Sequence, residues 1–247
     1  MGCVERKHYS RKERYATSAW AMIAYQTRNP GFRISEGVLS AEECETIVSS
    51  LSNSKVSKGR AGARHLMCVS EVARVASDTR LLEVARRELG TEPFPFRATL
   101  FEKSGKANWL VVWHQDTALP LRERFDAPGW GPWSEKAGVP YAHAPASALS
   151  RVVALRIHLD ASTTDNGPLR IVPRSHVLGI LTDEEICSVA KEYGFVECLV
   201  PKGGILMMSP LIIHSSSKVR TNVPRRVLHI EYSDSPSLGQ GIEFAVV

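Results

Sequence analysis

The 247-residue sequence has no apolar run long enough to cross a membrane, and its five cysteines form no CxxC pair or other zinc-binding spacing. A membrane-spanning helix needs roughly 18 apolar residues, and stretches such as RVLHI and GGILMM are far shorter. The leading MGCVERKHYSRKERY has no apolar core of the kind found in secretory signals. No internal repeat is present. These absences argue against a membrane protein or a disulfide-rich secreted protein, and predict a cytoplasmic protein with reduced cysteines.

The charge is only mildly unbalanced, with a formal net charge of +5 at pH 7. Residues 1–15 carry +3 of this excess, and the other 232 residues carry +2. The basicity is therefore concentrated in a short leading segment, and the sequence does not predict a nucleic-acid interface. Hydrophobic residues make up 43% of the chain, which is enough for a folded core.

Helical signals are concentrated in the first 90 residues. Ser40 and Glu43 form a capping box ahead of apolar residues at helical spacing, which predicts a helix over 41–51. Asp78 as N-cap and Gly90 as C-cap frame a second helix over 79–89. The polar segment 52–65 between them is interpreted as a loop, and a capping box from Thr182 predicts a later helix.

From residue 94 onward, short apolar or β-branched runs alternate with turn residues. Eight candidate strands are FRATLFEK, WLVVWHQ, RVVALRIHL, PLRIVP, VECLV, GILMM, LIIH and RRVLHIEY. Eight antiparallel strands suffice for a jelly roll, also called a double-stranded β-helix, which is a cupin-like architecture. The predicted fold is therefore mainly β with flanking helices.

We expect a single domain over residues 1–247. Its parts are a tail and lead-in over 1–33, a helical buttress over 34–93, a jelly-roll core over 94–232 and a C-terminal tail over 233–247. A long loop over 117–149 interrupts the core, and its aromatic residues Trp130, Trp133 and Tyr141 predict a packed lid over the mouth.

The residues with the clearest chemical signal are His114 and Asp116, which end an apolar strand. Residues i and i+2 of a strand point to the same face, so the two side chains can share one cation. A hydrogen-bonded His–Asp pair without metal would leave the same pattern. His214, at the end of another apolar run, supplies a possible third ligand. Two histidines and one carboxylate with open coordination positions form the facial triad of non-haem Fe(II) oxygenases.

Arg225 and Arg226 open the last predicted strand, 11 and 12 residues after His214. A guanidinium is a natural bidentate partner for a carboxylate inside a barrel. Alternate residues of a strand face inward, so only one of the two is expected to do so, and a solvated strand edge is the other interpretation of the pair.

Between about Gly37 and Tyr232 the sequence resembles the phytanoyl-CoA dioxygenase family of Fe(II)- and 2-oxoglutarate-dependent oxygenases. The resemblance rests on WHQD (113–116), LRIHLD followed by DNGPLRIVPRSH (165–176), and LIIHSSS with RRVLHIEY (211–232). It implies that His114, Asp116 and His214 bind iron. It also implies that Arg225, with Arg226 as the alternative, binds the distal carboxylate of 2-oxoglutarate, assisted by Ser216.

One residue departs from the family pattern. Arg156 in LRIHLD stands where many members have tryptophan. An inward Arg156 would reach the other carboxylate of the co-substrate or an anionic substrate. The resemblance therefore does not carry acyl-CoA specificity to this chain.

The expected function is an Fe(II)- and 2-oxoglutarate-dependent dioxygenase that uses O₂ to hydroxylate a small molecule, with release of succinate and CO₂. Asp116 argues against a halogenase, because a halide ion would need the metal coordination position that this carboxylate is expected to occupy. An alternative is a non-catalytic metal- or ligand-binding β-barrel that acts as a sensor. The absence of an arginine from the cavity would favour this alternative. A serine hydrolase using His214 and a neighbouring serine is the least supported alternative, since no GxSxG motif is present.

Overall fold

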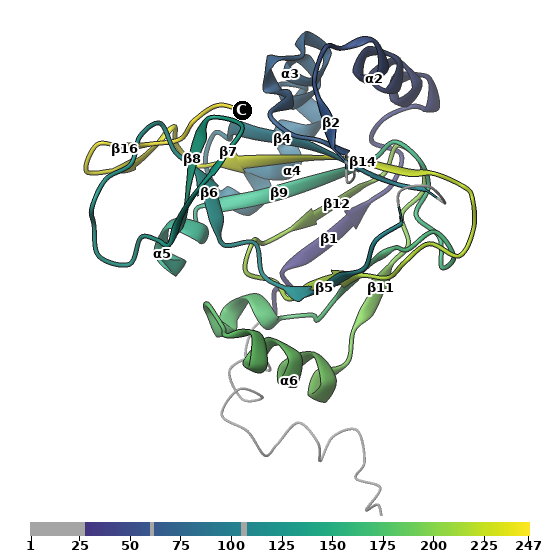
Figure 1. Ribbon diagram of the computed structural model, residues 1–247. Coiled ribbons are helices and arrows are strands. Elements are labelled where there is room, and N and C mark those ends of the chain that lie inside the picture. The colour runs from purple at the N-terminus through teal and green to yellow at the C-terminus, as the bar shows by residue number, and fades with distance from the viewer. Residues whose placement is uncertain (1–27, 60–61, 105–107) are drawn as a thin grey trace, which may run out of the picture.

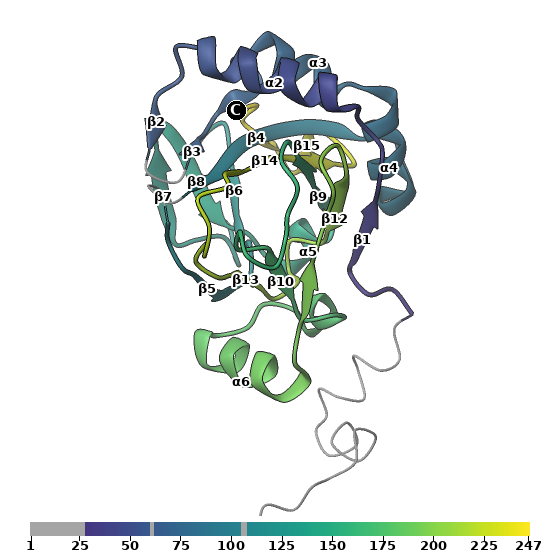
Figure 2. The same ribbon diagram turned by 90° about the vertical axis from the view of Figure 1, so that its right-hand side faces the viewer.

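The computed structural model describes residues 28–59, 62–104 and 108–247, so the basic leading segment lies outside the described residues. Two antiparallel sheets face each other across the interior (Figure 2). The larger sheet has the order β1-β12-β9-β14-β4-β3-β2. Its strands are Phe32–Ser35, Ile205–Met208, Val152–His158, Arg225–Ser233, Phe94–Lys103, Gly62–Ala63 and Lys58–Gly59.

The smaller sheet has the order β11-β10-β13-β5. Its strands are Val196–Cys198, Leu169–Ile171, His214–Ser216 and Val111–His114. The two facing sheets confirm the predicted double-stranded β-helix. The prediction that LIIH forms a strand is wrong, because β13 begins at His214 and the preceding residues turn into it. His214 therefore opens its strand and does not end it.

Helices α2 (Ala41–Asn53), α3 (Ser70–Ala76) and α4 (Thr79–Leu89) cover the outer face of the larger sheet (Figure 1). The capping box of Ser40, the Asp78 N-cap and the left-handed Gly90 C-cap are all present, so both predicted helices are confirmed. Helix α3, which was not predicted, has no side-chain cap at its N-terminus. The segment 52–65, expected as a loop, contains the β2–β3 pair.

The main hydrophobic core lies between these helices and the larger sheet. Leu155, Ile157, Leu228 and Ile230 all point to the helices and are fully buried. Because strand side chains alternate, the residues between them face the interior. The interior face of β9 and β14 therefore carries Arg156 and His229, which lie directly opposite each other.

The segment 117–149, expected as a long loop, forms its own small sheet. Strands β6 (Ala118–Pro120), β8 (Val139–His143) and β7 (Trp133–Lys136) pair in this order, and helix α5 (Ala146–Leu149) follows. Ala137 and Gly138 both have positive φ in the turn between β7 and β8. The aromatic packing predicted for this segment is present, since Phe125 contacts the rings of Trp130 and Trp133.

The remaining elements close the two ends of the structure. Helix α6 (Asp183–Tyr193) starts at the predicted Thr182 capping box and packs by the smaller sheet. Short 3₁₀ helices span Leu66–Cys68 and Ser175–Leu178. After β14, β15 (Ser237–Gly239) pairs with β16 (Ile242–Glu243), and Phe244 stacks on Phe96 at 4.1 Å between ring centroids. No helix in the described ranges is both long and apolar enough to cross a membrane.

Gly167 lies in the turn before β10, where its backbone closely approaches the end of the strand that carries Ser216. Its φ is +70°, and a Cβ atom here would lie 2.5 Å from the carbonyl oxygen of Ser217. We expect Gly167→Ala to lower the free energy of unfolding by about 2 to 3 kcal/mol, through backbone strain and this clash. Gly90→Ala is the matched control, since its φ is +72° with no atom within 4 Å. It should lose about 1 kcal/mol, and equal losses in urea denaturation would contradict the close-approach argument.

Candidate metal centre

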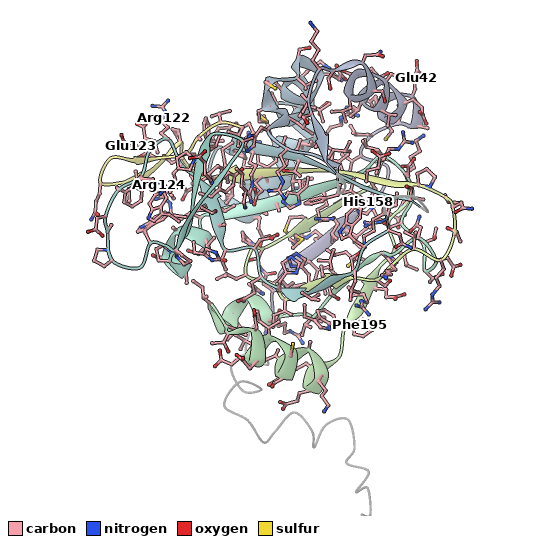
Figure 3. All side chains as sticks on the ribbon, in the orientation of Figure 1. Glu42, Arg122, Glu123, Arg124, His158 and Phe195 are labelled. Atoms are coloured by element: carbon pink, nitrogen blue, oxygen red, sulfur yellow. The ribbon has the colours of Figure 1, made fainter. Side chains whose placement is uncertain are left out.

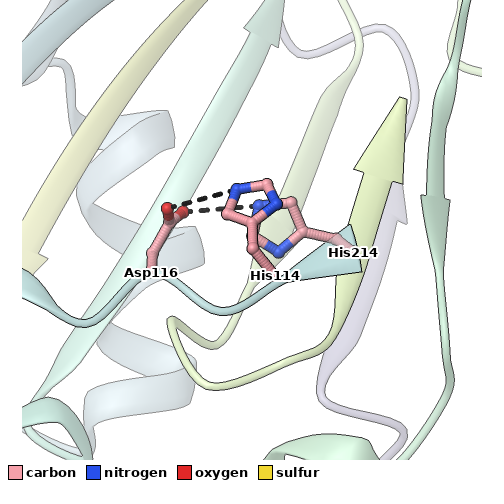
Figure 4. A group of neighbouring side chains, drawn as sticks. All are labelled: His114, Asp116 and His214. Carbon is pink, nitrogen blue, oxygen red and sulfur yellow. Dashed lines mark ion pairs between the residues drawn. The ribbon is translucent and has the colours of Figure 1, made fainter. Parts of the chain in front are cut away.

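Three potential metal ligands meet where β5 and β13 pair. His114 and His214 lie directly opposite each other in the register, with ring centroids 4.2 Å apart. Asp116 follows two residues after His114, and its backbone N–H donates to the carbonyl of Pro210 at 2.9 Å. One ligand atom from each of the three residues lies within 4.8 Å of the others. The structure thus brings together all three residues that the sequence singled out (Figure 4).

Backbone contacts fix how the two imidazoles present their nitrogens. Nδ1 of His114 lies 2.8 Å from the carbonyl of Val112, and Nδ1 of His214 lies 2.9 Å from that of Ile212. A carbonyl only accepts, so each Nδ1 carries the proton and each Nε2 keeps its lone pair. The Nε2 atoms lie 3.8 Å and 3.5 Å from the carboxylate oxygens of Asp116. Both lone pairs are therefore directed to the side where the carboxylate lies.

Burial and the neighbouring charges together set the protonation states of His214 and Asp116. It lowers the pKa of His214 to about 4, with His114 acting in the same direction and Asp116 against it. Burial alone would raise the pKa of Asp116, but the adjacent histidines, led by His214, outweigh it and hold that pKa well below its usual range. A neutral imidazole beside an ionised carboxylate is the form in which these side chains bind a divalent metal.

The residue between the ligands has a supporting role. Gln115 is buried and points away from the metal ligands, as alternation along a strand requires. Its amide donates to the carbonyls of Gly179 and Leu211 at 2.8 and 2.7 Å, and its oxygen accepts from the N–H of Leu181. These three bonds tie the end of β5 to its neighbours, which holds Asp116 in place.

A cavity opens beside the three ligands, and two arginines reach it from the larger sheet. It is lined by Phe101, Lys103, Trp109, Val111, His114, Asp116, Arg156, Leu169, His214, Ser216 and Arg225. Arg225 is 2% exposed, and its Nε and Nη1 atoms have no hydrogen-bond partner among the described residues. Arg156 also has an unpartnered Nε, while its Nη1 lies 3.1 Å from Nδ1 of His229. Buried donors without partners mark a place where an anion would fit.

The two adjacent arginines of β14 have different environments. Burial lowers the pKa of Arg225 to about 9, and Arg156 acts in the same direction. Arg226 lies outside the cavity, where its guanidinium makes two 2.7 Å bonds to the carboxylate of Asp160. Of the pair, only Arg225 faces the metal ligands.

Lys103 is a cavity residue that the sequence reasoning missed. It is 1% exposed and lies opposite Arg225 in the β4–β14 register. Its Nζ atom lies 2.8 Å from Oγ of Ser216 and 2.7 Å from the carbonyl of Ser217. Ser216 lines the cavity as predicted, and its hydroxyl donates to the carbonyl of Gly167 at 2.8 Å. A lysine at a strand end is usually a surface residue, so composition gives no signal for this position.

The chain also matches known proteins. The family model for phytanoyl-CoA dioxygenase covers residues 27–227. The ectoine dioxygenase of Sphingopyxis alaskensis is 24% identical over 184 residues, which are 66% of this chain and 53% of that protein. The ectoine dioxygenase of Halomonas elongata is 33% identical over 104 residues, which are 42% of this chain and 25% of that protein. The matched part spans about half the length, or less, of these curated relatives.

Solved structures share the fold. The apo form of EctD from S. alaskensis superposes with a TM-score of 0.64 at 22% identity, covering 87% of this chain and 76% of that one. The same protein has been solved with 2-oxoglutarate and 5-hydroxyectoine. The 2-oxoglutarate-dependent epimerase SnoN of nogalamycin biosynthesis gives 0.63 at 19% identity, covering 88% and 83%. With the family model matching most of the sequence, the chain belongs to the phytanoyl-CoA dioxygenase family of Fe(II)- and 2-oxoglutarate-dependent oxygenases.

Proposed function

We propose that this protein is an Fe(II)- and 2-oxoglutarate-dependent hydroxylase of a small molecule. The observation that carries the proposal is the placement of unpartnered Arg225 donors in the same cavity as the potential ligands His114, Asp116 and His214. A metal-binding sensor does not need a buried, unpaired guanidinium beside its metal. A diacid co-substrate accounts for it.

The residues present fit both groups. His114, Asp116 and His214 would hold the iron and leave its other coordination positions open. Iron with bound 2-oxoglutarate supplies O₂ activation, in which one oxygen atom enters the substrate as R–OH and the other enters succinate as CO₂ leaves. Arg225 would bind the distal carboxylate, and Ser216 would contact it from β13. Arg156 lines the cavity beside His229, where it would bind the other carboxylate.

The charges in the cavity match this assignment. Asp116 leaves a divalent iron with a net charge of about +1, and Arg225 adds one positive charge beside it. Together they match the two negative charges of 2-oxoglutarate, and Arg156 and Lys103 make the same lining more positive still. The protein thus supplies the electrostatic attraction and the orientation.

The hydrolase alternative has no support in these contacts. The hydroxyl of Ser216 bonds to Lys103 and Gly167, and that of Ser215 accepts from Arg170. Nδ1 of His214 is bonded to a backbone carbonyl, and its Nε2 lies next to Asp116. Neither Ser215 nor Ser216 therefore has His214 as a hydrogen-bond partner among the described residues.

Conversion of 2-oxoglutarate to succinate tests the proposal. Purified protein with Fe(II) and ¹³C-labelled 2-oxoglutarate should form labelled succinate in air and none under nitrogen, even without a prime substrate. Mass spectrometry of the product provides the measurement. Failure of the wild-type protein to form succinate, or unchanged formation by Asp116→Ala, would sink the proposal.

Lys103 makes a further prediction about the binding of 2-oxoglutarate. Burial, followed by Arg225, Arg156 and Arg170, lowers the pKa of Lys103 to about 7. At pH 8 the free protein therefore holds mostly the neutral amine, and a dianion bound beside it favours the ammonium form. Binding should take up a proton at pH 8, and affinity should fall as the pH rises above 7.

Calorimetry in buffers of different ionisation enthalpy measures this proton uptake. Lys103→Met should bind 2-oxoglutarate without it, whereas Lys55→Met, a change at an exposed lysine, should behave like the wild type. Equal proton uptake by Lys103→Met would show that another group is responsible.

A further inference from the structure

A second, larger cavity adjoins the proposed metal centre. Its volume is about 550 Å³, within the range of small-molecule sites. Phe101 lines both this cavity and the one at the metal ligands. Most of the second cavity is apolar or small, with Val56, Ala63, Thr99, Leu100 and Ala137 in its wall. A substrate lying here would share the Phe101 side chain as a wall with the cavity at the potential metal ligands.

One edge of this second cavity is positively charged. Arg64 and His65, which follow β3, belong to its lining, and so does Ala137, the neighbour of Lys136. The Lys136 ammonium lies 4.3 Å from the centroid of the Tyr141 ring, and the Arg97 guanidinium lies 5.8 Å from the same ring. Segments that are far apart in the sequence thus bring Lys136 and Arg97 to one tyrosine, while Arg64 lies in the wall of the second cavity.

The tyrosine is a rigid support for these cations. Tyr141 is 3% exposed, and its hydroxyl lies 3.0 Å from Nε2 of His65. The two rings stack with an interplanar angle of 11°. His65 has a φ of 59°, in the left-handed region that is unfavourable for a histidine. Such strain is typical of functional sites.

The cations near Tyr141 exceed the nearby acids. Arg97 is paired with the buried carboxylate of Glu231. Arg64 and Lys136 have no side-chain hydrogen bond or ion pair within the described ranges, and Lys136 is half-buried. Burial, then Arg97 and Arg64, lower the pKa of Lys136, while Asp116 raises it.

We infer that the prime substrate is a small organic anion, with an apolar body in the second cavity and a carboxylate or phosphate group held by Arg64 and Lys136. The inference rests on the proposed function, because it assigns the substrate of that same site. The 2-oxoglutarate dianion is assigned to the iron centre, Arg225 and Arg156 in the first cavity. Arg64 and Lys136 do not line that cavity and are therefore available to a second anion.

Calorimetry with matched probes tests this inference on the full chain, loaded with Fe(II) and saturating 2-oxoglutarate under nitrogen. Saturation keeps the probes away from Arg225. Wild-type protein must first show the optical signal of the iron–2-oxoglutarate complex, so that a failure of the proposed function is recognised separately. The probes are acetate, phenylacetate, 4-biphenylacetate and phenyl phosphate, and each of the two arylacetates is paired with its neutral amide.

We expect at least one aryl anion to bind about tenfold more tightly than the amide of the same body, and acetate to bind most weakly. Comparing the affinities of phenylacetate and phenyl phosphate then shows whether the site prefers a carboxylate or a phosphate group. Arg64→Gln and Lys136→Gln should each remove about tenfold of the anion affinity and leave amide binding as it was. Lys136→Arg keeps the positive charge and should therefore bind the anions about as tightly as the wild type does.

Arg124→Gln is the matched control, because Arg124 is exposed at the periphery of the same lid segment (Figure 3). It should bind every probe like the wild type. The inference is wrong if no anion binds more tightly than its amide. It is equally wrong if Arg64→Gln and Lys136→Gln bind the anions as tightly as Arg124→Gln does.

Discussion

Replacing Arg225 by methionine is expected to weaken 2-oxoglutarate binding by about 100-fold or more, the largest effect that we predict for a single side chain. Its buried guanidinium has two unpartnered nitrogens in the cavity, and losing one member of a buried, hydrogen-bonded charge pair costs several kcal/mol. Calorimetric titration of the iron-loaded protein under nitrogen measures the change in Kd.

The neighbouring arginine is the matched control for this experiment. Arg226→Gln removes the same charge one residue away, where the guanidinium contacts Asp160 outside the cavity. It should change 2-oxoglutarate affinity by less than about threefold, as a screened charge at a distance does. Equal losses in the two variants would contradict the assignment of Arg225.

Arg225→Met should also be more stable than the wild type when 2-oxoglutarate is absent. An unpaired buried guanidinium destabilises the folded state, and methionine of similar length removes that cost. We expect the free energy of unfolding to rise by about 1 kcal/mol or more in urea denaturation. A loss of stability together with a loss of binding would instead indicate a structural role for Arg225.

Replacing Asp116 by alanine is expected to weaken Fe(II) binding by about 100-fold or more. It is the only carboxylate of the three-residue set, and even an outer partner of a metal ligand is worth 10- to 100-fold in metal affinity. Fe(II) binding is measured by competition with a chromogenic chelator under nitrogen, with His214→Ala as a second variant expected to show a similar loss.

Asp126→Ala controls for the general effect of removing a carboxylate, since Asp126 is exposed in the lid segment. It should bind Fe(II) like the wild type. If Asp116→Ala retained wild-type affinity, the three residues would form only a hydrogen-bonded group, and the metal site would have to be sought elsewhere in the chain.

The sequence predicted the two sheets and the convergence of His114, Asp116 and His214, even though one strand was placed too early. The predicted convergence is confirmed despite this error, because it needed only that His214 lie near the end of a strand that pairs with β5. The register that sets His214 opposite His114 depends on pairing between segments about a hundred residues apart. Local patterns contain no information about such pairing.

The direction of Arg225 could not be predicted because β14 is buried on both faces. Val227 and His229 face the interior, Leu228 and Ile230 face the helices, and all four are buried. A strand of this kind has no alternation of polar and apolar residues from which to determine which side faces the cavity. Lys103 was missed for a different reason, because a lysine at the end of a strand is usually exposed, whereas this one is buried.

The segment 117–149, which was predicted to be a lid, was the least predictable part. Pro132, Pro140 and Pro145 interrupt its sequence, and proline argues against a strand. Gly138 in the two-residue connection between β7 and β8 was the available sequence signal for a hairpin. The positive region around Tyr141 has no sequence signature at all, because Arg64, Arg97 and Lys136 come from three separate segments.

Anaerobic titration of the purified protein with Fe(II) and 2-oxoglutarate tests the central claim most directly. We predict a visible charge-transfer band that needs both components, saturates at one equivalent of iron, and is lost in Asp116→Ala. Arg225→Met should require a far higher concentration of 2-oxoglutarate to form it. A wild-type protein that gives no band, or variants that give the same band at the same concentrations, would contradict the assignment of this cavity to iron and 2-oxoglutarate.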